Sequence, residues 1–214
     1  MDPTIIIPIM IALIPCLIAL IILCRTSFNY WLSAILGGSG WFIALLIRAP
    51  ILAYFQNLGF HGIVMSSIMA GVFEESIRYF ITWYKNLRKI DLRSSISIGL
   101  GWGLTEAVII YALQVPVASI TRGYEWTAFI PGAIERNIAI VFHLSMTLLL
   151  LVAIVRRFKL LLLIAIFLHV LLNVVGVFTM LMLGNPWITE CIIALLVLMM
   201  IVPIMIYVRK NIPS

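Results

Sequence analysis

The sequence predicts an all-α fold, a polytopic membrane helix bundle with about seven transmembrane helices and its N-terminus outside. Three observations lead to this prediction. Of the 214 residues, 64% are hydrophobic and only 10% are charged, whereas roughly a quarter of a soluble domain is charged. Several apolar runs exceed the ~18 residues that mark a membrane-spanning helix. Basic residues recur in alternate loops between those runs. The protein is therefore expected to be an integral, multi-pass membrane protein.

Seven apolar runs are expected to be helices, because a chain in lipid must satisfy its backbone hydrogen bonds internally. They cover residues 4–24, 30–55, 63–84, 94–113, 132–155, 160–183 and 187–208. The first run has no basic residue before it and no small-residue cleavage pattern after it, so we interpret it as a retained span. Residues 114–131 are expected to form the longest external loop. Residues 1–214 are predicted to be a single transmembrane domain, with its catalytic core at about 63–183.

The placement of basic residues predicts the orientation. Loops on one side of the predicted membrane carry Arg25, Lys85, Arg88, Lys89, Arg93, Arg156, Arg157, Lys159, Arg209 and Lys210. The opposite loops carry only Arg122. The positive-inside rule therefore places the N-terminus outside and the C-terminus inside. The net charge of +6 arises at these helix ends, so the expected partner is the lipid bilayer and not nucleic acid.

The most informative residues are the polar ones inside the spans, each of which costs at least a few kcal/mol at the bilayer centre unless paired or hydrated. At 1.5 Å per residue, the central ones on four helices lie roughly 14–18 Å from a helix end, near the middle of a ~30 Å hydrocarbon core. They are Glu74, Glu75 and Arg78 in the third span, Glu106 in the fourth, Glu135, Arg136 and His143 in the fifth, and His169 and Asn173 in the sixth. One shared site is expected. Arg48 and Glu190 are interpreted as residues near the outer interface.

Small residues in the fourth span predict how one of these groups reaches the others. Ser95, Gly99, Gly103 and Ala107 recur every four positions. Such a ladder lets a neighbouring helix backbone approach closely. We therefore expect Glu106 to lie near the polar residues of other helices.

The residue types in this site suit hydrolysis of an amide by activated water. Two adjacent glutamates with one arginine allow one carboxylate to be held ionised while the other acts as a general base. A histidine can relay the proton. A second histidine and an amide, four residues apart on one helix face, can donate to an oxyanion. The predicted catalytic residues are Glu74, Glu75, His143, His169 and Asn173, with Arg78, Glu106, Glu135 and Arg136 as supporting residues.

Other intramembrane hydrolases are excluded by their motifs. A rhomboid-type serine site needs Gly-x-Ser-x-Gly, which Ser39 lacks. An aspartyl site needs two membrane aspartates, but Asp2 and Asp91 lie outside the predicted spans. The His-Glu-x-x-His helix of zincins is absent.

Three alternatives remain open from the residues alone. The polar groups could relay protons in a proton-coupled transporter. The chain could be a non-catalytic membrane scaffold subunit. It could also be a protease that holds zinc at Glu74, His143 and His169. Because neither histidine has the spacing of zinc helices, the sequence favours a glutamate-activated water and no metal over the zinc version.

At these residues the chain resembles the CAAX-prenyl-protease and bacteriocin-processing superfamily of glutamic-type intramembrane proteases. Glu74-Glu75-x-x-Arg78, a histidine in a later helix and His169-x-x-x-Asn173 carry this resemblance. Within it the chain is most similar to the YhfC-like family, through the Gly-rich run 99–107 ending in Glu-Ala and the Glu-Arg run 135–143 leading to a histidine.

The resemblance implies an intramembrane endopeptidase that acts on a membrane-embedded or membrane-associated peptide. It implies that Glu74 and His143 activate water, and that His169 and Asn173 form the oxyanion hole. Two departures separate the chain from a true prenyl protease. Only two residues stand between the glutamate pair and the arginine, and Ala139 occupies a position where that pattern has phenylalanine.

Overall fold

The computed structural model describes residues 3–55, 58–87 and 90–212, and within these ranges seven long helices form one bundle. They are α1 (Ile6–Cys24), α2 (Phe28–Phe55), α3 (Gly59–Lys85), α4 (Leu92–Glu106), α6 (Ile130–Val155), α7 (Leu160–Leu183) and α8 (Pro186–Asn211). Asp2, Arg88 and Lys89 lie outside the described residues. Each long helix coincides with one of the predicted spans, so the all-helical bundle is confirmed.

In the described part of the chain, six helical segments are long and apolar enough to cross a membrane by length and composition. The remaining long helix, α3, carries Glu74, Glu75 and Arg78, all three of them buried inside the bundle. Large apolar side chains such as Ile22, Phe167 and Met199 are more than half exposed on the outer faces of their helices. An apolar exterior around buried charges is the pattern of a lipid-facing bundle. The protein is an integral, multi-pass membrane protein.

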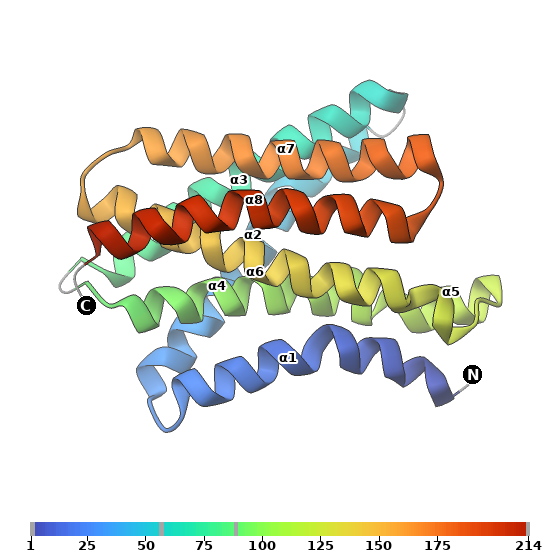
Figure 1. Cartoon of the computed structure of the whole chain (residues 1–214), viewed down its shortest axis with the longest axis horizontal. Coiled ribbons are helices and arrows are strands. Elements are labelled where there is room, and N and C mark those ends of the chain that lie inside the picture. Colours follow the sequence, from blue (N-terminus) through green and yellow to red (C-terminus); the bar gives the residue numbers. More distant parts are fainter. Residues whose placement is uncertain (1–2, 56–57, 88–89, 213–214) are drawn as a thin grey trace.

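Helix α4 packs on α2 and on α6, and Figure 1 shows it between α1 and α6. Helix α3 packs between α2 and α7, and α8 packs on α6 and α7. The N-terminus and the C-terminus lie at opposite ends of the long axis (Figure 1). An odd number of crossings requires this arrangement.

Glycines on opposite faces of α4 bring its two neighbours very close. A Cβ atom on Gly99 would lie 2.8 Å from the Cα atom of Leu144 on α6. A Cβ atom on Gly101 would lie only 2.0 Å from the carbonyl oxygen of Ala34 on α2. The predicted small-residue ladder thus forms the α4–α6 contact, and a second glycine face forms the α4–α2 contact.

The expectation of an external loop at 114–131 is wrong for its first half. Helix α4 continues through a π turn (Ala107–Ala112) into α5 (Gln114–Arg122). Helix α5 ends where Gly123 adopts a left-handed conformation with φ of 68°, which glycine tolerates without steric cost. A 3₁₀ turn, Trp126–Phe129, leads into α6.

The largest apolar core lies between α6, α7 and α8. It includes Phe142, Met146, Leu150, Ala165 and Val197. This core fills the half of the bundle next to the basic loops. The polar residues of α6 and α7 therefore lie on the side of this apolar core that faces away from the basic loops.

Candidate active site

Glu75 and Arg78 form an ion pair at the centre of the bundle. Their side chains are both 0% exposed, and Nη1 of Arg78 lies 2.5 Å from Oε1 of Glu75. The guanidinium also stacks on Trp102, with Cζ 4.3 Å from the ring centre. The same Glu75 oxygen accepts a hydrogen bond from Nδ1 of His169 at 2.6 Å. The sequence allowed Arg78 to pair with either glutamate, and the structure pairs it with Glu75.

His169 is thereby held with its other nitrogen free to bind a ligand. An ionised carboxylate can only accept a hydrogen bond, so Nδ1 of His169 carries a proton, and in the neutral imidazole Nε2 carries the lone pair. That Nε2 atom lies 3.9 Å from Oε2 of Glu74. A carboxylate that orients a histidine in this way is the usual support of a metal-binding imidazole.

Glu74 is held by groups from two other helices. Its Oε1 atom lies 2.7 Å from Nη1 of Arg48 on α2. Its Oε2 atom accepts a hydrogen bond from Nε1 of Trp102 on α4 at 3.2 Å. Arg48 is therefore a site residue, a role that its interpretation as a residue near the outer interface did not include. A single arginine in an otherwise apolar span was the signal available in the sequence, but its partner could be identified only in the fold.

His143 has protein partners at both ring nitrogens. Nη2 of Arg78 donates to Nδ1 at 2.7 Å. Because a guanidinium has no acceptor, Nδ1 is unprotonated and the ring proton is on Nε2. Nε2 donates to Oε2 of Glu106 at 2.6 Å. Arg78 thus connects the imidazole of His143 to Glu75, which in turn holds His169.

The supporting residues Glu106, Glu135 and Arg136 belong to the same hydrogen-bond network. Nη1 of Arg136 donates to Oε1 of Glu106 at 2.8 Å, and its Nε donates to Glu135 at 2.5 Å. Arg136 and His143, two turns apart on α6, therefore hold the two oxygens of one carboxylate. The close packing at Gly99 places Glu106 within their reach.

The network opens into a cavity of about 420 Å³. Its polar lining residues are Arg48, Glu74, Glu106, Glu135, Arg136, His143, His169, Asn173, Thr189 and Glu190. Asn173 lines the cavity one turn after His169, as the spacing predicted. Glu190, interpreted as a residue near the outer interface, lies four residues after the start of α8 and also lines the cavity. Glu75 and Arg78 lie behind the cavity wall.

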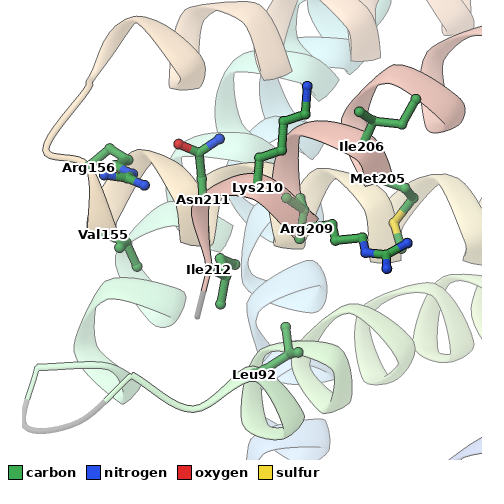
Figure 2. A pocket seen from close by; sticks show the side chains of 10 residues that line it. Leu92, Val155, Arg156, Met205, Ile206, Arg209, Lys210, Asn211 and Ile212 are labelled. Carbon is green, nitrogen blue, oxygen red and sulfur yellow. The ribbon is translucent and has the colours of Figure 1, made fainter. Parts of the chain in front are cut away.

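A second hollow, of about 1100 Å³, lies at the basic end of the bundle. Figure 2 shows its lining, in which Arg156, Arg209, Lys210 and Asn211 stand among apolar side chains. Its described lining contains neither a carboxylate nor a histidine. It therefore lacks the groups that a hydrolytic site needs.

Three side chains of the cavity fit a metal ion by chemistry and distance. Glu74, His143 and His169 each offer one ligand atom, and these atoms lie within 4.8 Å of one another. Two ligands about 2.1 Å from a tetrahedral zinc are roughly 3.4 Å apart, so the 3.9 Å between Glu74 and His169 needs only a small contraction. Coordination by His143 has to replace one of its two hydrogen bonds.

The charges of the described site residues also favour a bound cation. With every carboxylate ionised and the histidines neutral, five carboxylates face three guanidinium groups, which leaves two negative charges in excess. The carboxylates are Glu74, Glu75, Glu106, Glu135 and Glu190, and the arginines are Arg48, Arg78 and Arg136. An uncompensated charge in the membrane interior is costly. One divalent ion would remove the excess.

The fold and the site define a membrane-embedded helical protein with a buried acid–histidine centre that suits hydrolysis. The model of the YhfC intramembrane metalloprotease family matches the chain over residues 10–123 and 112–193. The chain belongs to this family and is thus an intramembrane protease by descent. No match to the chain was found among curated proteins. Membership in this family favours a protease over a transporter or a scaffold subunit. Because the family is described as a metalloprotease family, it also supports the zinc alternative more than the expectation that no cofactor is bound.

Proposed function

We propose that the protein is a zinc-dependent intramembrane endopeptidase whose metal ligands are Glu74, His143 and His169. The observation that carries this proposal is the convergence of these three ligand atoms within 4.8 Å at the wall of a polar cavity. Two histidines and one glutamate, with a further position left for water, are a common ligand set of catalytic zinc. When bound, zinc supplies Lewis-acid activation of water and of the scissile carbonyl.

The other residues of the site have roles that follow from their contacts. Glu75 holds the tautomer and orientation of His169 through Nδ1. Arg78 neutralises Glu75, and its hydrogen bond to Nδ1 of His143 is the one that coordination would replace, because Nε2 carries the ring proton. Glu106 accepts a hydrogen bond from His143 and lines the cavity, so it can accept the proton that leaves the attacking water. Arg136 keeps Glu106 in place.

Asn173 is the proposed donor to the oxyanion. It lines the cavity one helical turn beyond His169, and its amide N–H groups can hydrogen-bond a carbonyl oxygen that gains negative charge. His169, the other donor expected from the resemblance, would serve as a metal ligand instead. The substrate is proposed to be a membrane-embedded or membrane-associated peptide.

The metal content of the purified protein tests the proposal. We expect about one zinc per chain, and loss of most of it in His169→Ala and Glu74→Ala, because catalytic zinc normally has three protein ligands. His61→Ala is the matched control, since His61 is exposed and is not among the residues that line the cavity. Elemental analysis after dialysis measures the outcome. Zinc retained at wild-type level in both ligand variants would refute this ligand set.

A glutamic mechanism without metal is the second candidate. The 3.9 Å gap between Nε2 of His169 and Oε2 of Glu74 is the observation that favours it, because one water could bridge these atoms. In that case cleavage of a transmembrane peptide library in vesicles survives chelation. Glu74→Gln then lowers cleavage by about 10²–10⁴-fold, as removal of a general base does. Loss of cleavage on chelation, restored by zinc, would decide for the metal.

A further inference from the structure

We propose that water and the peptide substrate reach the catalytic centre from the end of the bundle opposite the basic loops. They would pass through an outer arm of the cavity, which we define by Asn173, Gly176, Val177, Met180, Thr189 and Glu190. This inference deepens the proposed function by assigning its substrate to one half of the bilayer. The substrate class is a peptide segment in the outer half of the membrane.

The cavity is strongly displaced toward one end of the bundle. On α7 its lining runs as far as Leu181, two residues from the last helical residue. On α8 the lining begins at Thr189, three residues after Pro186. At 1.5 Å per residue, both positions are only about 3–5 Å from the helix ends. The arm therefore reaches the turn between α7 and α8.

The path toward the basic end is closed by the apolar core. From Ser145 to Ala153, every residue of α6 is buried. His143 lies twelve residues before the last residue of α6, which is roughly 18 Å at 1.5 Å per residue. The hollow of Figure 2 shares none of its described lining residues with the catalytic cavity. Access from that end would require the core to open.

The outer arm has the groups that a wet, substrate-binding passage needs. Asn173, Thr189 and Glu190 offer polar atoms along it, and Oε2 of Glu190 is buried with no partner among the described residues. Such a carboxylate oxygen needs water or a substrate donor. Val177 and Met180 also line the arm and are about two-fifths exposed, and we infer that the arm opens to the lipid beside them. A membrane peptide can therefore enter laterally while water enters from the outer end.

Gly176 leaves room in the arm between α7 and α8. A Cβ atom there would lie 3.2 Å from Cδ1 of Ile193, itself a lining residue. A larger side chain at this position would fill the passage. Gly176→Leu is therefore a plug for the proposed route.

Thiol labelling of single-cysteine variants tests the route without any need for activity. Cys16, Cys24 and Cys191 are first replaced by alanine. Val177→Cys and Thr189→Cys probe the arm, and Ala139→Cys probes the cavity one turn before His143. Leu195→Cys is the lipid-facing control, since Leu195 is 62% exposed. Val155→Cys lines the hollow at the basic end. A charged, membrane-impermeant thiol reagent is added to intact cells.

Both arm cysteines should react at least about tenfold faster than Leu195→Cys, because only hydrated thiols form the reactive thiolate. Val155→Cys should react only after permeabilisation. Adding Gly176→Leu should slow the labelling of Ala139→Cys by about tenfold or more, since hydration of that thiol depends on the arm. Arm cysteines that react no faster than Leu195→Cys, or only after permeabilisation, would overturn the inference. Labelling of Ala139→Cys that is not slowed by Gly176→Leu would also overturn it. If the arm cysteines are labelled from outside in a protein that contains no zinc and cleaves no peptide, the proposed route is supported and the proposed function is wrong.

Discussion

Buried charges at the site are stabilised by one another and not by solvent. Glu75 and Arg78 have no exposed side-chain surface, and each also contacts a histidine. A buried ion pair pays a large desolvation cost, which is returned only if its remaining hydrogen bonds are satisfied. Oε2 of Glu75 and Nε of Arg78 nevertheless lack partners among the described residues. The pair thus tolerates no further loss of contacts.

Glu75→Gln should therefore destabilise the fold. The substitution leaves the guanidinium of Arg78 without its counter-charge, and breaking a buried pair typically costs about 3–5 kcal/mol. Glu190→Gln is the control, because the buried oxygen of Glu190 has no partner to lose in the described structure. Denaturant unfolding in detergent measures both. Equal unfolding free energies for the two variants would contradict the structural role assigned to the pair.

Among the elements, α4 determines how closely the site can assemble. Gly99 and Gly103 let α6 approach, and a Cβ atom on Gly103 would lie 2.8 Å from the Cα atom of Ile140. The π turn begins at the residue after Glu106. Single π turns often occur at functional sites, where they change the direction of the following residues. Here the turn separates the carboxylate of Glu106 from the outer helix α5.

Gly101→Ala should lower stability by about 1–3 kcal/mol, the range for overpacking, because the new methyl group would clash with the backbone of α2. The contact is with a carbonyl oxygen at 2.0 Å, which cannot move without shifting the helix. Gly176→Ala is the matched control. Its methyl group would meet only the flexible end of Ile193, so the better helix propensity of alanine should offset the contact. Thermal unfolding midpoints in detergent compare the two. A Gly101→Ala variant as stable as Gly176→Ala would show that α2 and α4 are not in close backbone contact.

At the scale of the whole molecule, the bundle has two chemically different ends. The described basic residues between α1 and α2, between α6 and α7 and in the last turn of α8 lie at one end, together with the C-terminus (Figure 1). The cavity that contains the candidate active site lies toward the other end. Positive-inside topology would place the first end in the cytoplasm and the cavity in the outer half of the membrane.

Reporter fusions test this orientation. Green fluorescent protein fused after residue 214 should fluoresce, and alkaline phosphatase fused there should be inactive, because a cytoplasmic C-terminus is expected from the basic loops. Alkaline phosphatase inserted after Tyr124 should be active. The reverse pattern would invert the topology and would place the catalytic cavity on the cytoplasmic side.

Composition and periodicity were sufficient for the helices and for most of the residues that gather at the site. Long apolar runs in lipid must form helices, because their backbone hydrogen bonds have no other partners. Polar residues at similar depths must contact one another, because each costs free energy in the membrane when unpaired. Glu74, His143 and His169 do meet, and Asn173 lines their cavity. Their roles in catalysis remain predictions. The continuation of α4 into α5 was missed, because propensity alone does not distinguish a polar helix from a polar loop.

Only the tertiary structure decided which charge pairs with which. Arg78 lies within reach of both glutamates along α3, and Glu74 is paired instead with Arg48, twenty-six residues earlier on another helix. The sequence shows that each buried charge needs a partner. It does not show how each helix is rotated about its axis, and this rotation determines which charged side chains face each other. The same holds for the cavity. Its displacement toward one end results from how α7 and α8 pack on α6, which depends on side-chain volumes in three helices at once.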